Sequence, residues 1–336
     1  MKKICVLGAG SWGTALSLLL SDNGHDVTVW SIDPEEVLML KEYSEQRDKL
    51  PGVILPSSIV FTTEMETALK EAEIVVCAVP SPFVRTTMQN ALKFIQDGMI
   101  VVNVAKGIED NTFKTMTQVI EEECPNVHVA VLSGPSHAEE VGRKIPTTIV
   151  VGAKDREVAE IVQDTFMNEV FRVYTSPDTI GIELGGSLKN VIALAAGIVD
   201  GLGFGDNTKA ALMTRGIAEI MRLVTAMGGH METVAGLSGI GDLIVTCTSK
   251  HSRNRNAGYL IGQGRTYHEA MDEVKMVVEG VYSAKAALAL AKQNNIDMPI
   301  VEAVNAVLFD GVNAREAAMQ LLLRDRTSES ANLEWQ

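Results

Sequence analysis

A short apolar segment, residues 4–7, runs directly into Gly8-Ala9-Gly10-Ser11-Trp12-Gly13, and this junction constrains the fold more than any other feature of the chain. The pattern G-x-G-x-x-G between a strand and a helix has a specific physical use. Gly8 permits a sharp turn, Gly10 lets backbone touch a pyrophosphate, and Gly13 lets the helix pack closely on the strand. The helix N-terminus then directs unpaired N–H groups at the phosphates, so the segment predicts a dinucleotide site.

Alternating strand and helix patterns follow this turn for more than a hundred residues. The continuous apolar runs are typical of central parallel strands covered on both faces. We expect the strands at residues 26–30, 73–79, 99–104, 128–132 and 147–151.

Beyond residue 176 the strand patterns stop and helical patterns continue, beginning with a long helix rich in small residues that Asp178 or Thr179 would cap. We therefore predict an α/β fold with a doubly wound, Rossmann-type, mostly parallel sheet followed by an all-α domain. The expected division is a dinucleotide-binding domain at 1–177, a helical substrate-binding domain at 178–325 and a polar tail at 326–336.

The composition argues against some classes of binding partner. The net charge of -14, from 43 acidic and 29 basic residues, argues against nucleic acid and against an anionic membrane surface. We expect no membrane insertion, because no uninterrupted apolar run reaches the length of a spanning helix. The four cysteines show no paired spacing, which fits a reducing cytoplasm, and the six histidines show no metal-ligand spacing, so no metal is expected.

The end of the second strand leaves the phosphorylation state of the cofactor open. An acidic side chain there would accept hydrogen bonds from the ribose of NAD, and a basic one would suit the 2′-phosphate of NADP. The chain offers neither at Ser31 or Ile32. Asp33 comes late and precedes Pro34, so it could instead cap the next helix. Both NADH and NADPH are therefore expected cofactors.

Polar residues follow the later strands, at the sheet edge where ligands of open α/β sheets bind. Lys106, Gly134 and Ser136 are candidates by this position alone. An ordinary surface turn would explain Lys106-Gly107 equally well.

Lys189 lies among small and apolar neighbours in the long helix. Burial lowers the pKa of a lysine and makes it usable as a proton acceptor near neutral pH. A lysine whose charge reaches the surface of the domain is the alternative.

A second polar cluster begins with Asp242, which follows glycines that suggest a tight turn into a cleft, and continues through Thr246. Ser252-Arg253-Asn254 then brings together hydroxyl, guanidinium and amide donors, a set suited to a phosphate. A polar loop with a helix-capping aspartate and solvated arginines is the alternative interpretation.

These segments together resemble the bacterial NAD(P)-dependent glycerol-3-phosphate dehydrogenases. The resemblance extends in order from the N-terminus to about residue 311 and rests on several long motifs: VLGAGSWGTAL, VNVAKGIE, LSGPSHAEEV, GGSLKNVIALAAGIVDGLGFGDNTKAAL, GLSGIGDLIVTCTSKHSRNRNAG and VVEGV. It implies a cytoplasmic enzyme that interconverts sn-glycerol 3-phosphate and dihydroxyacetone phosphate for phospholipid synthesis, and we expect a homodimer.

The resemblance also implies roles for single residues. Lys189 would be the proton acceptor, while Lys106, Asp242 and Thr246 would orient the reacting groups and tune it. The implied substrate contacts are Lys106, Gly134, Ser136, Lys189, Asp242, Ser252, Arg253 and Asn254.

For the cofactor, the resemblance and the glycine-rich turn point to one set of residues. Many family members carry a basic residue just after the second strand, where this chain has Ser31-Ile32, so the usual preference for NADP does not transfer directly. The expected cofactor contacts are Gly8, Gly10, Ser11, Trp12, Gly13, Ser31, Lys106, Ala138, Arg253, Val277 and Glu279.

Two alternatives remain open on the sequence. A 3-hydroxyacid dehydrogenase or ketopantoate reductase would share the architecture but recognise a carboxylate and need no substrate phosphate. A non-catalytic sensor of NAD would bind NADH without turnover and would not need a buried Lys189.

Overall fold

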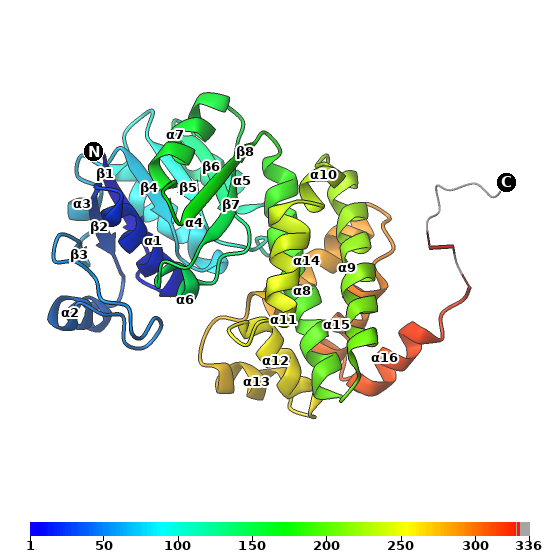
Figure 1. Ribbon diagram of the computed structural model, residues 1–336. Coiled ribbons are helices and arrows are strands. Elements are labelled where there is room, and N and C mark those ends of the chain that lie inside the picture. The colour runs from blue at the N-terminus through cyan, green and yellow to red at the C-terminus, as the bar shows by residue number, and fades with distance from the viewer. Residues whose placement is uncertain (327, 330–336) are drawn as a thin grey trace.

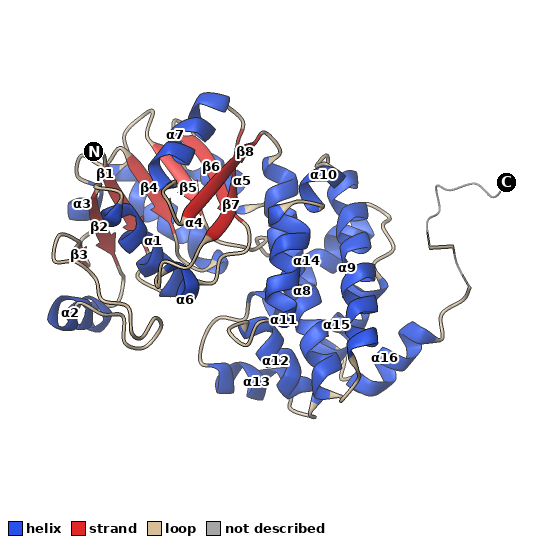
Figure 2. Cartoon of the chain, viewed as in Figure 1, coloured by secondary structure: helices blue, strands red, loops and turns tan. Residues whose placement is uncertain are grey.

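The structure is a computed structural model that describes residues 1–326, 328 and 329. Two bodies lie side by side, with the sheet and its helices in the N-terminal one (Figure 1). Colouring by secondary structure places the strands in this first body and shows the second body as packed helices (Figure 2). Strand β8 ends at Ser176 and helix α8 begins at Thr179, so the two bodies meet at this short connection.

The first body is built on an eight-stranded sheet with the order β3-β2-β1-β4-β5-β6-β7-β8. All paired neighbours are parallel except β6 and β7. This confirms the predicted Rossmann-type, mostly parallel sheet. The strands are β1 Lys3–Leu7, β2 Asp26–Trp30, β3 Val60–Thr62, β4 Ile74–Cys77, β5 Ile100–Asn103, β6 His128–Ser133, β7 Thr147–Ala153 and β8 Phe171–Ser176.

Strand β7 departs from the expectation of a central parallel strand, because it runs antiparallel to β6. The connection contains only the four-residue helix α6, Ala138–Val141. Such a helix spans about 6 Å, too little to carry the chain back along the sheet, so the chain reverses instead. Strand β3 has only three residues, and β8 alternates buried and exposed positions, which explains why apolar runs did not predict them.

Helices cover both faces of the sheet, as the continuous apolar runs predict. In β1, Ile4 and Val6 pack into the core of one face, while Cys5 and Leu7 pack into the core of the other. The first face is covered by α1 Ser11–Asp22, α2 Pro34–Tyr43, α6 and α7 Arg156–Phe166, and the second by α3 Met65–Leu69, α4 Val84–Ala91 and α5 Met116–Glu123.

The second body surrounds helix α8, Thr179–Gly201, which is capped by the carboxylate of Asp178 as expected. Small residues bring α8 into backbone contact with helix α12. A Cβ at Gly197 would lie 2.0 Å from the Arg255 carbonyl oxygen, and one at Gly258 would lie 2.0 Å from the Leu194 carbonyl oxygen. The other helices are α9 Asp206–Ala226, α10 Met231–Val234, α11 Asp242–Thr248, α12 Arg253–Gly262, α13 Tyr267–Val274, α14 Glu279–Gln293, α15 Pro299–Phe309 and α16 Ala314–Leu322.

Helix α8 is also long and apolar enough to cross a membrane by length and composition, and it is the one such helix in the described part of the chain. Its apolar window is entirely buried inside the protein. Packing against neighbouring helices therefore accounts for its hydropathy. All four cysteines are buried free thiols.

Candidate active site

Lys189 lies halfway along α8, only 5% exposed, and its ammonium group faces the start of helix α11. Its Nζ donates to Asp242 Oδ1 at 3.0 Å and to Thr246 Oγ1 at 2.6 Å. Burial lowers the pKa of Lys189 to about 8; the Asp242 carboxylate opposes this shift and the Lys106 ammonium adds to it. The predicted burial and depressed pKa are thus present, and the group can exchange a proton near neutral pH.

Asp242 is the centre of the cluster. It is 1% exposed and follows an irregular π turn, Leu237–Gly241, that delivers it to the first position of α11. Its second carboxylate oxygen accepts from Lys106 Nζ at 2.6 Å. Burial by itself raises the pKa of Asp242, but the two ammonium groups outweigh it and hold the pKa below its ordinary value. Asp242 therefore fixes both lysines through one charged group.

Lys106 joins the two bodies at the edge of the sheet. It follows strand β5, and its Nζ also donates to the Gly134 carbonyl at 3.0 Å and to Ser136 Oγ at 3.4 Å. Gly134, just after β6, has φ +143°, and a Cβ there would press on Ile149. The three residues chosen from their strand-end positions thus converge, and they meet Asp242 from the helical body.

The glycine-rich turn has the geometry that the pattern predicts. Gly8 has φ +115°, where a Cβ would lie 2.9 Å from the Ala78 backbone, and a Cβ on Gly13 would lie 2.0 Å from the Gly8 carbonyl oxygen. A Cβ on Gly10 would meet nothing within 4 Å, so this position borders open space. Helix α1 begins at Ser11, directly after the turn, and Trp12 packs against the core of the sheet. These residues fit a bound pyrophosphate.

Ser252, Arg253 and Asn254 form the start of helix α12 rather than a loop. The Ser252 hydroxyl caps the helix by accepting from the Arg255 backbone N–H at 3.2 Å. The Asn254 amide donates to Asn190 at 2.9 Å and accepts from the Gly280 N–H at 2.8 Å. Arg253 donates to the Val277 carbonyl at 3.3 Å, which brings together two predicted cofactor contacts. Their contact with a phosphate stays a prediction.

Three other predicted cofactor residues are Glu279, Ala138 and Ser31. Glu279, at the start of α14, accepts from the Ser81 hydroxyl at 2.6 Å, and Ser81 follows strand β4. Burial raises the pKa of Glu279, although the hydrogen bonds from Ser81 oppose the shift. Ala138 begins helix α6 and is 7% exposed. Ser31 is buried, and its hydroxyl donates to Glu36 at 2.5 Å.

Sequence reasoning missed His137. This residue lies between the predicted Ser136 and Ala138, and its ring centroid lies 6.0 Å from that of His251. Burial lowers the pKa of His137, and the nearby Lys189 ammonium lowers it further. Within the described chain, its Nε2 is buried without a hydrogen-bond partner. Its position in the sequence, between Ser136 and Ala138, is the signal that could have identified it.

Glu183 was also missed, although it is a charged residue in the same apolar helix that singled out Lys189. It is 5% exposed in α8, and it accepts from the Thr117 N–H at 2.9 Å and from the Asn103 amide at 3.2 Å. The other end of the Asn103 amide accepts from the Ala105 N–H at 3.0 Å. Glu183 thereby supports the turn that carries Lys106.

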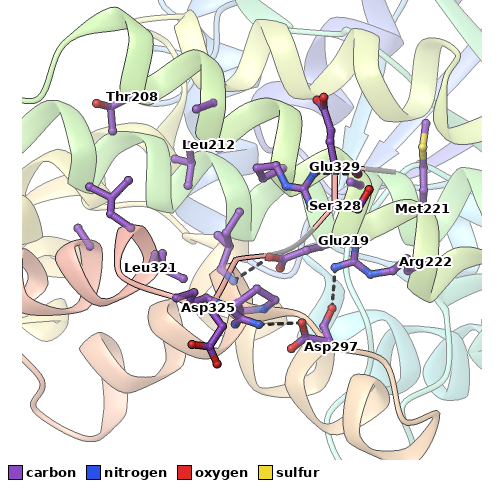
Figure 3. A pocket seen from close by; sticks show the side chains of 18 of the residues that line it. Thr208, Leu212, Glu219, Met221, Arg222, Asp297, Leu321, Asp325, Ser328 and Glu329 are labelled. Atoms are coloured by element: carbon purple, nitrogen blue, oxygen red, sulfur yellow. Dashed lines mark hydrogen bonds and ion pairs between the residues drawn. The ribbon is translucent and has the colours of Figure 1, made fainter. Parts of the chain in front are cut away.

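A cavity of about 1690 Å³ lies elsewhere, between α9, α15, α16 and residues 323–326, 328 and 329. Figure 3 shows its lining, where the Arg222 side chain points toward the Asp297 carbonyl oxygen, 2.7 Å away. Glu219 in its wall accepts from the Ile300 N–H at 2.8 Å and so caps helix α15, while burial raises its pKa to about 7. None of the predicted site residues lines this cavity.

Among the described residues there is no group of three His, Cys, Asp or Glu side chains placed to hold a metal ion. The cluster is thus an acid–base network of two lysines, one aspartate and one threonine. Only Lys189 in it has a pKa of about 8 and a nearly buried amine. This arrangement can transfer a proton to or from a group bound between the bodies.

Comparison with known proteins identifies the family. Models of the NAD-dependent glycerol-3-phosphate dehydrogenase N-terminus and C-terminus match residues 3–159 and 178–319. The NAD(P)+ glycerol-3-phosphate dehydrogenase of Agathobacter rectalis is 63% identical over 335 residues, covering 100% of each chain. That of Fusobacterium nucleatum is 57% identical, covering 98% of this chain and 99% of the relative. The chain belongs to the NAD-dependent glycerol-3-phosphate dehydrogenase family.

Solved structures agree with this family membership. The glycerol-3-phosphate dehydrogenase of Coxiella burnetii is 34% identical with a TM-score of 0.93, covering 96% of this chain and 99% of that one. A ketopantoate reductase of Ralstonia eutropha, at 13% identity and a TM-score of 0.60 over 95% of this chain and 99% of that one, shares the fold alone. The two ranges matched by the family models contain Lys106, Lys189 and Asp242.

Proposed function

We propose that this chain is an NAD(P)-dependent oxidoreductase that interconverts sn-glycerol 3-phosphate and dihydroxyacetone phosphate and so supplies backbone for glycerophospholipids. The observation that carries the proposal is the Lys106–Asp242–Lys189 network at the junction of the sheet and the helical body. Membership in the glycerol-3-phosphate dehydrogenase family supports the substrate and the reaction.

The dinucleotide site is formed by the turn between β1 and α1. The open space at Gly10, the close packing of Gly13 and the unpaired N–H groups of α1 suit a pyrophosphate. A dinucleotide held there would supply hydride transfer at the substrate C2. Ser81, Glu279, Arg253 and the Val277 carbonyl lie where the two bodies meet, and they would border the cofactor.

Lys189 is the group that accepts and donates the proton. In alcohol oxidation its neutral amine accepts the proton of the C2 hydroxyl, and in ketone reduction its ammonium donates a proton to the C2 oxygen. Asp242 and Thr246 hold the amine in place at 3.0 Å and 2.6 Å. Lys106, anchored to the same carboxylate, would place its positive charge near the oxygen that becomes negative during hydride transfer.

The substrate phosphate would bind at the start of α12. The helix N-terminus offers backbone N–H groups, and Arg253 adds a guanidinium in a chain of net charge -14. This remote charge would fix a small substrate in a reactive orientation and thereby lower the entropy cost of the reaction. A carboxylate substrate would not require donors arranged for a tetrahedral anion at this position.

The partners follow from this chemistry: a small phosphorylated substrate, a nicotinamide dinucleotide and, we expect, a second copy of the chain in a homodimer. The four buried free thiols support a reducing cytoplasm as the location. Neither a nucleic acid nor a membrane is expected as a partner, because the chain is strongly acidic.

The test is reduction of dihydroxyacetone phosphate, followed by loss of absorbance of NADH and NADPH in parallel. Ketopantoate and a 3-keto acid serve as alternative substrates under the same conditions. Turnover of the phosphorylated ketone well above that of both acids is the expected result. Turnover of an acid in its place would support another dehydrogenase of this fold, and dinucleotide binding without turnover of any substrate would support a sensor.

A further inference from the structure

A buried polar cluster lies beside the glycine-rich turn, and none of the steps above uses it. Glu36, only 8% exposed, accepts from the Ser31 hydroxyl at 2.5 Å, from the Gln46 amide at 2.8 Å and from Lys49 Nζ at 2.5 Å. Gln46 is 1% exposed, and its amide also donates to the Ala9 carbonyl at 2.9 Å. We call Ser31, Glu36, Gln46 and Lys49 the ribose-side cluster.

The position of this cluster is set by the strand that ends there. The N–H of Gly8 donates to the Trp30 carbonyl at 2.8 Å, so the glycine-rich turn and the end of β2 are joined. Ser31 follows Trp30 directly, and Asp33 caps helix α2, whose first turn brings Glu36 back toward Ser31. In doubly wound folds, an acidic group at this edge accepts hydrogen bonds from the adenosine ribose.

Glu36 has the capacity for one more hydrogen bond. Two carboxylate oxygens offer about four acceptor positions. Three of these are used by Ser31, Gln46 and Lys49. A ribose 2′-hydroxyl can donate to the position that remains, whereas a 2′-phosphate has only acceptors and negative charge to offer at the pH of the cell.

The surrounding charges favour the hydroxyl as well. Asp33 caps α2 and Glu35 accompanies Glu36 in its first turn, and Ile32, which is 80% exposed, provides no cation beside them. The ammonium group of Lys49 is already paired with Glu36, and the Arg47 guanidinium is paired with Glu45. A phosphate placed here would face the carboxylates of α2 and would have to break the Lys49–Glu36 ion pair to gain that ammonium group as a partner.

We propose that Glu36, held by the ribose-side cluster, selects NAD(H) over NADP(H) by accepting a hydrogen bond from the ribose and repelling a 2′-phosphate. The inference rests on the proposed function in one respect, the use of a nicotinamide dinucleotide. Like charges brought together in a binding site cost several kcal/mol, so NADH is expected to bind about ten- to a thousandfold more tightly than NADPH.

The test is equilibrium titration of the free enzyme with NADH and with NADPH, followed by fluorescence and without substrate. Glu36→Gln removes the charge but keeps the shape, and it should reduce the NADPH-to-NADH Kd ratio by about tenfold or more. Glu35→Gln, the same charge change on the exposed neighbour, is the matched control and should move the ratio far less. A Glu36→Gln variant that is folded and keeps the wild-type ratio overturns the proposal, as does wild-type enzyme that binds NADPH as tightly as NADH.

A second measurement needs no variant. Salt screens repulsion between Glu36 and a 2′-phosphate, so the NADPH-to-NADH Kd ratio of the wild-type enzyme should fall as ionic strength rises. A ratio that rises with salt would mean that a cation such as Lys49 holds the phosphate, and it would overturn the proposal. If both dinucleotides bind and dihydroxyacetone phosphate is reduced, these failures concern Glu36 alone. If neither dinucleotide binds, the proposed function fails with it.

Discussion

Replacing Asp242 by Asn removes the one negative charge that lies between two ammonium groups, 2.6 Å from Lys106 and 3.0 Å from Lys189. Asparagine keeps the shape of the side chain, so the start of α11 should be preserved. An opposite charge at such a distance shifts a pKa by roughly one to three units. The pKa of Lys189, about 8 in the native chain, should therefore fall by that amount in Asp242→Asn.

The sign of the effect differs between the two directions of the reaction. Reduction needs the Lys189 ammonium, so its rate falls as the pH rises through the pKa, and oxidation needs the neutral amine, so its rate rises there. With a pKa near 8, about nine-tenths of Lys189 carries a proton at pH 7; after a fall of two units, about one-tenth does. Reduction at pH 7 should accordingly drop about tenfold from protonation alone.

The assay is the pH dependence of kcat/KM in both directions at constant ionic strength. The readout is the pH at which each profile bends, because this pH reports the pKa of Lys189. The maximal kcat/KM is not used, because a loss of orientation would lower it as well. Asp200→Asn is the control, since Asp200 lies on α8, the helix of Lys189, but pairs with Lys209 at 2.6 Å and with Arg255 at 2.6 Å. Profiles of Asp242→Asn that bend at the wild-type pH would refute the coupling of Asp242 to Lys189.

Three further predictions concern the phosphate, the ribose and the fold. Unphosphorylated dihydroxyacetone should hardly be turned over, and Arg253→Ala should mainly raise KM for dihydroxyacetone phosphate and weaken NADPH binding; comparable efficiency on both ketones would exclude the phosphate assignment. Ile32→Arg should shift the NADH-to-NADPH preference toward NADPH, because an arginine–phosphate contact is charge-assisted, and an unchanged Kd ratio would place the ribose elsewhere. Gly197→Ala should lower the free energy of unfolding in urea by about 1–3 kcal/mol or more, because its Cβ would meet the Arg255 carbonyl at 2.0 Å. Gly205→Ala, where a Cβ meets nothing within 4 Å, is the control, and equal losses would contradict the packing argument.

The sheet and the long helix could be predicted because their signals are local. The turn from Gly8 to Gly13 and the buried apolar strands can each be recognised from a few consecutive residues, and the structure confirms them. The antiparallel β7 could not be predicted, since strand direction depends on how the connecting segment packs rather than on the strand itself. Helix α12 could not be predicted either, because its first residues are polar and its packing depends on the glycines of α8.

The candidate site was predictable in part. Lys106 and Lys189 were selected for different local reasons, strand-end position and an apolar context, and only the fold shows that Asp242 joins them. The family resemblance supplied their roles, which stay predictions. The role proposed for Glu36 could not be predicted, because it depends on contacts with Gln46 and Lys49, which lie 10 and 13 residues further along the chain.

Lys189 is the acid–base group in the proposed reaction, and Lys189→Ala tests this role directly. Turnover should fall by about two to four powers of ten, the usual contribution of such a group, while NADH affinity changes little. Lys189→Arg should not restore turnover, because a guanidinium keeps its proton in this range.

The decisive measurement is turnover of Lys189→Ala with and without small primary amines in the buffer. The truncated side chain leaves space where the ammonium group lay, so an added amine can take over the proton. We expect amines to restore part of the lost rate, to an extent that follows the pKa of the amine. Near-normal turnover of Lys189→Ala without any amine would contradict this expectation and would transfer the role to Lys106, the neighbouring lysine on Asp242.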